Sequence, residues 1–120
     1  MKFELGEVNV LCTDRKASLR FYRDLLGFEV ESEEGSAVHL RGLGIALLLL
    51  PEATERPAPR PYGTCATLSF DVLVDDLAAA RAYFEGHDVP CEGEPGAGFF
   101  VARDPDGLAI EVVGREGASS

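Results

Sequence analysis

The first half of the chain changes its hydrophobic period several times, and each change predicts an element. Residues 6–12 (GEVNVLC) alternate between apolar and polar positions, which is typical of a half-buried strand. Residues 15–27 carry apolar side chains at helical spacing, after the N-cap candidate Asp14 and up to the stop signal Gly27. Apolar runs separated by glycine-containing turns then predict strands at 28–32, 37–41 and 45–50.

A proline-rich segment follows, and after it the same order of elements restarts. Residues 51–63 hold four of the seven prolines, and we interpret this segment as an extended linker because proline lacks the N–H that a sheet ladder needs. The later pattern predicts a helix capped by Asp76, a tight turn at 104–107 (DPDG) and a frayed tail at 115–120. The elements expected here are a strand at 65–74, a helix at 77–88, and strands at 89–93, 98–103 and 108–114.

The repeated order of elements predicts two similar modules that together form a single domain. Neither β-α-β-β-β module, at 1–50 and at 64–115, is large enough to bury its sheet face alone, so the two should pair into one domain spanning 1–120. The linker at 51–63 would join them. The order of elements indicates the α+β class.

Charge and cysteine content narrow the range of partners and compartments. The net charge is −10, with 11 Lys and Arg against 21 Asp and Glu, which argues against nucleic acid and favours attraction of cationic small molecules. Cys12, Cys65 and Cys91 are odd in number and widely spaced, as in a reduced cytoplasmic protein. The start of the chain lacks the apolar run of a signal peptide, and the longest apolar stretch, at 44–51, is too short to cross a bilayer. We therefore expect a cytoplasmic protein without a membrane partner.

Three stretches resemble the vicinal oxygen chelate superfamily: VNVLCTDRKASLRFYRDLLGFEV, SFDVLVDDLAAARAYFEGHDV and FFVARDPDGLAIEVVG. That superfamily joins glyoxalase I, extradiol dioxygenases, fosfomycin-resistance enzymes and bleomycin-resistance proteins. The resemblance implies two βαβββ modules that form a cupped mixed β-sheet, with helices on the outer face and the concave face holding a ligand or a metal. It also implies a homodimer, because relatives cover their open edges by pairing chains.

Reading each strand with a period of two divides its residues between a helix-facing side and a cup-lining side. A slip of one residue would exchange the two sides of a strand. The cup-lining residues that we predict as ligand-binding candidates are Glu7, Asn9, His39, Arg41, Leu48, Leu50, Ser69, Asp71, Phe99, Val101, Arg103, Glu111 and Val113.

The resemblance also implies where a metal would bind, and the residues there are poor ligands. Metal-using relatives place ligands on the first and last strands of each module, positions that fall on Glu7, Leu48, Ser69 and Glu111 in this chain. Iron, nickel or zinc requires three or four strong ligands, commonly including imidazole. We therefore predict no metal and no other cofactor. A divalent metal at Glu7 and Glu111, with water filling the remaining positions, is the alternative.

Glu111 and His39 are the candidates for catalytic roles. Each also has a structural interpretation: Glu111 as a solvated carboxylate satisfied by Arg41, Arg103 or water, and His39 as a hydrogen-bonded strand residue. Phe99 and Tyr62 could flank a pocket.

Three functions remain open on the sequence alone. The first is a metal-free small-molecule-binding protein, resembling bleomycin-resistance and other antibiotic-resistance members, that sequesters a hydrophobic or cationic metabolite. The second is a glyoxalase-like lyase or isomerase, or a dioxygenase, using Glu7, His39 and Glu111 as a substitute metal site or Glu111 as a metal-free acid–base group. The third is a structural or regulatory dimerisation module whose concave face is filled by its own apolar side chains.

Overall fold

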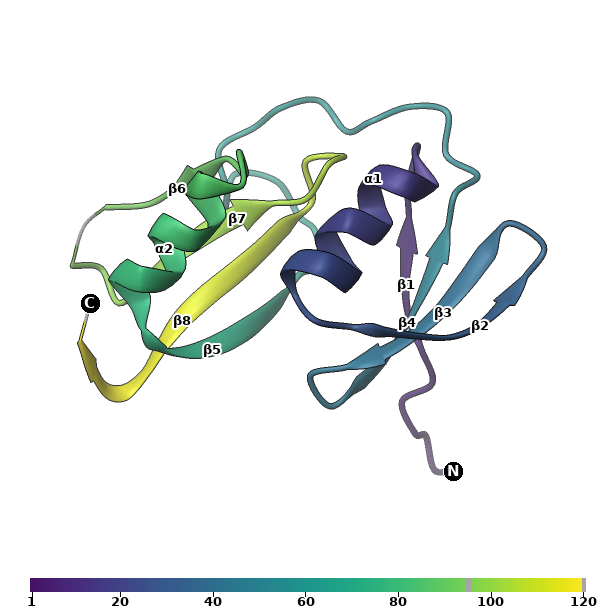
Figure 1. Ribbon diagram of the computed structural model, residues 1–120, viewed down its shortest axis with the longest axis horizontal. Coiled ribbons are helices and arrows are strands. Elements are labelled where there is room, and N and C mark those ends of the chain that lie inside the picture. Colours follow the sequence, from purple (N-terminus) through teal and green to yellow (C-terminus); the bar gives the residue numbers. More distant parts are fainter. Residues whose placement is uncertain (95, 120) are drawn as a thin grey trace. The chain divides into compact units, whose positions relative to one another are not determined.

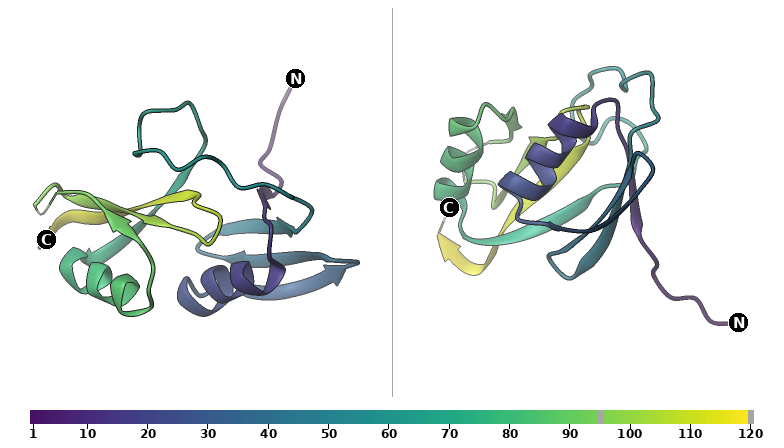
Figure 2. Two further views of the ribbon diagram at one scale, coloured as in Figure 1. Left: turned by 90° about the horizontal axis from the view of Figure 1, so that it is seen from above. Right: turned by 45° about the vertical axis from the view of Figure 1, so that its right-hand side comes forward.

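Each half of the chain folds as one four-stranded mixed sheet with a helix against it (Figure 1). The computed structural model describes residues 1–94 and 96–119, and these form two compact units, Met1–Arg56 and Pro57–Ser120. Figure 2 shows each helix lying on one face of the sheet of its own half. The α+β class and the repeated β-α-β-β-β order are confirmed.

The first half runs from one edge of its sheet to the opposite edge and then returns through the centre to pair with its own first strand. Its strands lie in the order β1-β4-β3-β2, with β1 parallel to β4 and the other pairs antiparallel. Its elements are β1 (Val8–Leu11), α1 (Arg15–Leu19), the π-helical turn η1 (Arg20–Leu25), β2 (Glu29–Glu34), β3 (Ala37–Gly42) and β4 (Ile45–Leu50).

The second half repeats this topology. Its strands lie in the order β5-β8-β7-β6, again with the first and last strands parallel and adjacent. Its elements are β5 (Phe70–Asp76), α2 (Leu77–Gly86), β6 (Cys91–Glu92), β7 (Phe99–Arg103) and β8 (Ala109–Ser119). Among the described residues, no helix is both long and apolar enough to cross a membrane.

Aspartate caps start both helices, as predicted. The Asp14 carboxylate accepts hydrogen bonds from the backbone N–H groups of Lys16 and Ala17, at 3.0 and 3.3 Å. The Asp76 carboxylate accepts one from Ala79, at 3.0 Å. Each cap satisfies backbone donors that the first turn of a helix leaves without a partner.

The first helix does not continue as one α-helix over 15–27. After Leu19 it widens into η1, where the Leu26 N–H donates to the Phe21 carbonyl at 3.0 Å, and it ends at Gly27 with φ of +89°. Two consecutive aromatics, Phe21 and Tyr22, are both buried in this turn. An apolar stripe at helical spacing does not distinguish a regular α-helix from one that widens in its last turns, so the sequence pattern predicted a single regular helix.

Several strand boundaries in the second half differ from those predicted: the strand predicted at 89–93 is only Cys91–Glu92, and the largest differences are at the start of β5 and the end of β8. β5 begins at Phe70 rather than at residue 65, because Phe70 pairs with Ile110 at the start of β8, and earlier residues have no strand beside them. The tail predicted to fray instead continues β8 to Ser119, which pairs with Asp76 at the end of β5. The partner strand sets both ends, and the local pattern does not contain that information.

The burial pattern supports the period-two phasing. Alternate side chains along the central strands are fully buried beneath the helices, among them Val38, Leu40, Leu47, Leu49, Phe100, Ile110 and Val112. The residues between them are half-buried or exposed, with one exception. Val101 lies on the cup-lining side and is only 2% exposed.

Candidate functional site

Two rows of side chains cross the open face of the second sheet. Cross-strand pairing aligns Asp71 of β5, Glu111 of β8, Val101 of β7 and Glu92 of β6 in one row. The next row contains Leu73, Val113 and Phe99. Leu73 is 54% exposed and Phe99 is 37% exposed. A row rich in carboxylates therefore lies beside an accessible apolar row.

Glu111 has a hydroxyl partner from outside the sheet. The Tyr62 hydroxyl donates to Glu111 Oε2 at 2.5 Å and lies 3.2 Å from Ser69 Oγ. Both Ser69 and Glu111 are half-buried. Two of the positions that the resemblance assigns to metal ligands thus meet at a single phenol hydroxyl.

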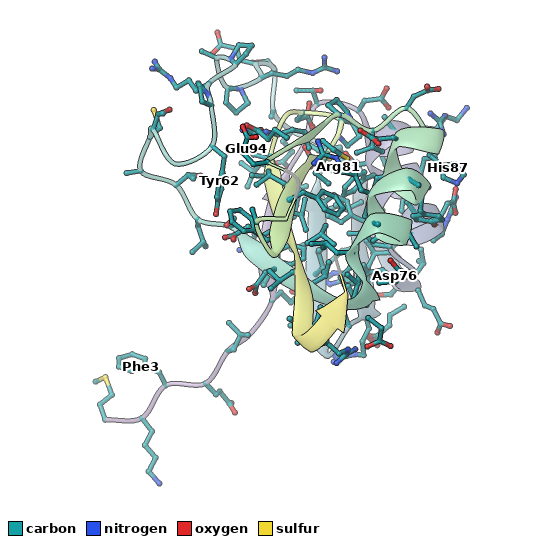
Figure 3. The ribbon with its side chains drawn as sticks, turned by 90° about the vertical axis from the view of Figure 1, so that its left-hand side faces the viewer. Phe3, Tyr62, Asp76, Arg81, His87 and Glu94 are labelled. Atoms are coloured by element: carbon teal, nitrogen blue, oxygen red, sulfur yellow. The ribbon has the colours of Figure 1, made fainter. Side chains whose placement is uncertain are left out.

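Tyr62 belongs to the proline arm, which we define as residues 57–64. The arm lies along the open face of the second sheet, where Arg103 donates to the Arg60 carbonyl at 3.0 Å and the Tyr62 N–H donates to Glu92 at 3.4 Å. Figure 3 shows Tyr62 on one side of this sheet, and Asp76 and His87, at the two ends of α2, on the other.

The position of Tyr62 explains the burial of Val101. The backbone of Tyr62 is bonded to Glu92 and its hydroxyl to Glu111, and Val101 pairs with both of those residues from the strand between them. Tyr62 therefore passes over Val101. The prediction that Val101 lines an open concave face is wrong in this respect, because the arm covers it.

The arginines expected to neutralise Glu111 have other partners. Arg103 Nε donates to Glu92 at 2.6 Å, and Arg41 Nε donates to Glu31 at 2.6 Å. From the sequence, Tyr62 is expected only as a flank of a pocket, and its contact with Glu111 is not predicted. The available signal was the lone aromatic residue in a segment otherwise made of prolines and polar or small residues.

In the first half, His39 is the partner of the other predicted carboxylate. His39 Nδ1 lies 2.7 Å from Glu7 Oε2, and Nε2 lies 3.5 Å from Glu34 Oε1. The hydrogen bond to Glu7 raises the pKa of His39 above its usual 6.5, although partial desolvation opposes the shift. Both ring nitrogens thus face carboxylates, an arrangement that favours the imidazolium.

The other first-half candidates lie around this pair without forming polar contacts to it. Asn9, Leu48 and His39 align across β1, β4 and β3. Asn9 and Arg41 are exposed, whereas Leu48 and Leu50 are half-buried.

The donor sets do not fit a transition metal. In the first half the expected ligand positions are Glu7 and Leu48, and the hydrocarbon side chain of a leucine cannot bind a metal. In the second half they are Glu111 and Ser69, and the serine offers only a neutral hydroxyl. Each carboxylate already accepts a hydrogen bond or ion pair from a protein group. Within 1–94 and 96–119, no group of three or more His, Cys, Asp and Glu side chains is arranged to hold a metal ion. Iron, nickel and zinc sites need more ligands than these.

Comparison with known proteins gives the family. The sequence model of the Glyoxalase/Bleomycin resistance protein/Dioxygenase superfamily matches residues 4–112. The chain belongs to this superfamily. A curated relative of the chain is the uncharacterized protein YaeR of Escherichia coli K12, which is 32% identical over 123 residues, covering 91% of this chain and 94% of YaeR.

Solved structures with this fold include both enzymes and resistance proteins. The trypanothione-dependent glyoxalase I of Leishmania major is 23% identical, with a TM-score of 0.74 over 97% of this chain and 89% of that one. The fosfomycin resistance protein FosX of Listeria monocytogenes is 13% identical, with a TM-score of 0.75 over 96% of this chain and 93% of that one. At these identities the similarity shows a shared fold, and the superfamily hosts more than one activity on it.

Proposed function

We propose that this superfamily member binds a small molecule with a cationic head and an apolar body on the open face of its second sheet, without a resident metal. The observation that carries the proposal is the pair of neighbouring carboxylates, Asp71 and Glu111, beside the apolar row of Leu73, Val113 and Phe99. We infer sequestration, as in an antibiotic-resistance protein, rather than turnover.

Electrostatics favours a cationic head. Asp71 and Glu111 pair directly across adjacent parallel strands, and like charges in that position repel each other. Arg103, which lies on this face, is already engaged by Glu92. An ammonium group can donate to both carboxylates and to Ser69, and the net charge of −10 would steer cations toward the protein.

The neighbouring row favours an apolar body. Leu73 and Phe99 are more than a third exposed, at 54% and 37%, which is unusual for large side chains aligned on one sheet face. Covering apolar surface contributes about 25 cal/mol per Å². The ligand class therefore combines an amine or similar cation with a hydrocarbon or aromatic skeleton.

Calorimetric titration with cationic glycopeptides, polycyclic aromatic cations and cyclohexylmethylammonium would test the proposal. Glu111→Gln keeps the side-chain volume and removes the charge, and we expect it to weaken binding about tenfold or more. The matched control is Glu31→Gln, which changes a carboxylate on β2 of the first half. Added salt should weaken binding by the wild type.

Two results would overturn the proposal. One is the absence of binding by every cation tested, or equal binding by Glu111→Gln and the wild type. The other is stoichiometric iron, nickel, zinc or manganese in the purified protein that is lost in Glu111→Gln. That second result would favour the lyase, isomerase or dioxygenase alternative, with Glu7, His39 and Glu111 as candidate ligands.

A further inference from the structure

The Tyr62 hydroxyl occupies the hydrogen-bonding position that the proposed function gives to the ligand's head. It donates to Glu111 Oε2 at 2.5 Å and lies 3.2 Å from Ser69 Oγ. A hydrogen bond to a carboxylate is one of the stronger neutral-to-charged contacts in proteins. An ammonium group cannot approach Glu111 from the same direction while Tyr62 is in place.

Apart from those of the Tyr62 hydroxyl, the proline arm has few hydrogen bonds to the sheet within the part of the chain that the structure describes. Pro57, Pro59 and Pro61 have no backbone N–H, so the arm cannot form a strand ladder. The Tyr62 N–H bond to Glu92 is long, at 3.4 Å, and Arg103 donates to the Arg60 carbonyl at 3.0 Å. Most arm residues are exposed. Moving the arm away would therefore break few hydrogen bonds among the described residues, uncover Val101 and leave the strand pairing unchanged.

We propose that Tyr62 is a built-in competitor of the ligand: its side chain holds Glu111 in the free protein and leaves when a cationic head takes its place. The inference rests on the proposed function and adds a control on that same site. When the arm leaves, the side chain of Val101, which is buried in the free protein, would become available to the apolar body of the ligand.

Competition of this kind has a quantitative signature. A ligand that binds only the open state has its apparent affinity reduced by the fraction of molecules in that state. The reduction is the same factor for every ligand of the site. The apparent affinity of weak ligands, such as neutral alcohols, would then be too low to measure. The affinity of an ammonium that gains two carboxylate contacts would remain measurable.

The test compares Tyr62→Phe with the wild type, using cyclohexylmethylammonium and its neutral analogue cyclohexylmethanol. Tyr62→Phe removes the hydroxyl and keeps the ring, and we expect it to tighten ammonium binding about tenfold or more. The alcohol should gain by the same factor. Tyr62→Ala, which also uncovers Val101, should bind at least as tightly as Tyr62→Phe. The matched control is Tyr83→Phe on α2, which should leave binding unchanged.

Tyrosine emission provides a second readout that follows the competitor itself. The chain has three tyrosines and no tryptophan, so tyrosine fluorescence is not masked. A carboxylate that accepts the phenolic proton quenches that fluorescence, so release of Tyr62 from Glu111 should raise it. Neither probe absorbs at the excitation wavelength. We expect emission to rise with ammonium concentration in the wild type and in Tyr83→Phe, and to stay flat in Tyr62→Phe.

Every outcome distinguishes the inference from the function on which it rests. Weaker or unchanged ammonium binding by both Tyr62 variants, or binding without a rise in emission, overturns the competitor and leaves the binding site standing. If the wild type, Tyr62→Phe and Tyr62→Ala all fail to bind the ammonium, the proposed function and the competitor are overturned together. Tighter binding with the emission rise supports both.

Discussion

At the scale of single residues, the two carboxylates predicted on the open sheet faces have partners of different chemistry. Glu7 faces an imidazole, and Glu111 faces a phenol. The attraction between Glu7 and His39 depends on the protonation state of the imidazole in the physiological range, where histidine titrates. The first half therefore contains a pH-dependent contact between its N-terminal segment and β3.

We expect part of the stability of the first half to be lost as pH rises. The pKa of His39 is raised above 6.5, mainly by its hydrogen bond with Glu7, so the stabilisation is fully present below about pH 6.5 and disappears as pH rises through the folded-state value. In His39→Gln, the midpoint of thermal unfolding should vary less between about pH 6 and pH 8 than in the wild type. His87→Gln is the control, and an unchanged pH slope in His39→Gln would contradict the prediction.

The three thiols should differ in reactivity because their surroundings differ. Cys65 is exposed, Cys91 is half-buried and Cys12 is buried. Burial raises the pKa of the Cys91 thiol, which lowers its thiolate fraction. With limiting iodoacetamide near neutral pH, mass spectrometry should find Cys65 labelled first, Cys91 later and Cys12 only on unfolding. Labelling of Cys91 before Cys65 would contradict this order.

The sequence could predict the site residues that sit on strands, and not the residue that contacts them from the arm. Glu111 and His39 follow from period two and from their chemistry within an apolar strand. Tyr62 is 49 residues from Glu111 and comes from a segment with no period. Only the three-dimensional path of the arm brings the two together.

At the scale of elements, local signals set the starts of helices and the turns, and partner strands set the strand ends. The caps Asp14 and Asp76 and the stop at Gly27 act within a few residues, so the sequence predicted them. The start of β5 and the extension of β8 depend on a parallel pairing between segments about forty positions apart, whose register no local pattern specifies.

The turn before β8 offers a direct test of such a local signal. The Asp104 side chain is buried, and its Oδ1 accepts hydrogen bonds from the N–H groups of Asp106 and Leu108, both at 2.9 Å. Asp104→Ala leaves these donors without that acceptor, and we expect it to lower the free energy of unfolding by about 2–3 kcal/mol in urea titrations.

Two further variants separate the acceptor from general effects of substitution. Asp104→Asn keeps an oxygen acceptor and should recover part of the loss. Asp75→Ala removes an exposed carboxylate that pairs with Arg115 at 2.8 Å, and should cost less than about 1 kcal/mol. Equal losses in Asp104→Ala and Asp75→Ala would show that the turn bonds contribute little.

At the scale of the whole molecule, the surface composition bears on association. Large apolar side chains are exposed in both halves, including Phe3, Leu5 and Leu11 in one and Leu68 and Leu73 in the other. Exposed apolar residues and open strand edges are features that soluble proteins usually cover by pairing chains. We therefore retain the homodimer as a proposal.

Light scattering coupled to gel filtration would test the dimer. At micromolar concentration we expect a mass of twice the 12.9 kDa chain. Leu11→Gln and Leu73→Gln change exposed positions in the two halves, and at least one should lower the dimer fraction while leaving the far-ultraviolet circular dichroism unchanged. A monomer mass for the wild type across this range would contradict the proposal.

The pairing of the first and last strands in each half has a consequence for synthesis. β4 and β8 are the last strands made in their halves, yet each lies inside its sheet and holds the first strand in place. A nascent chain that has emerged only as far as β3 or β7 therefore exposes an unattached leading strand. Non-local closure of this kind is slow, so the first strand of each half stays exposed while the rest of that half is being synthesised.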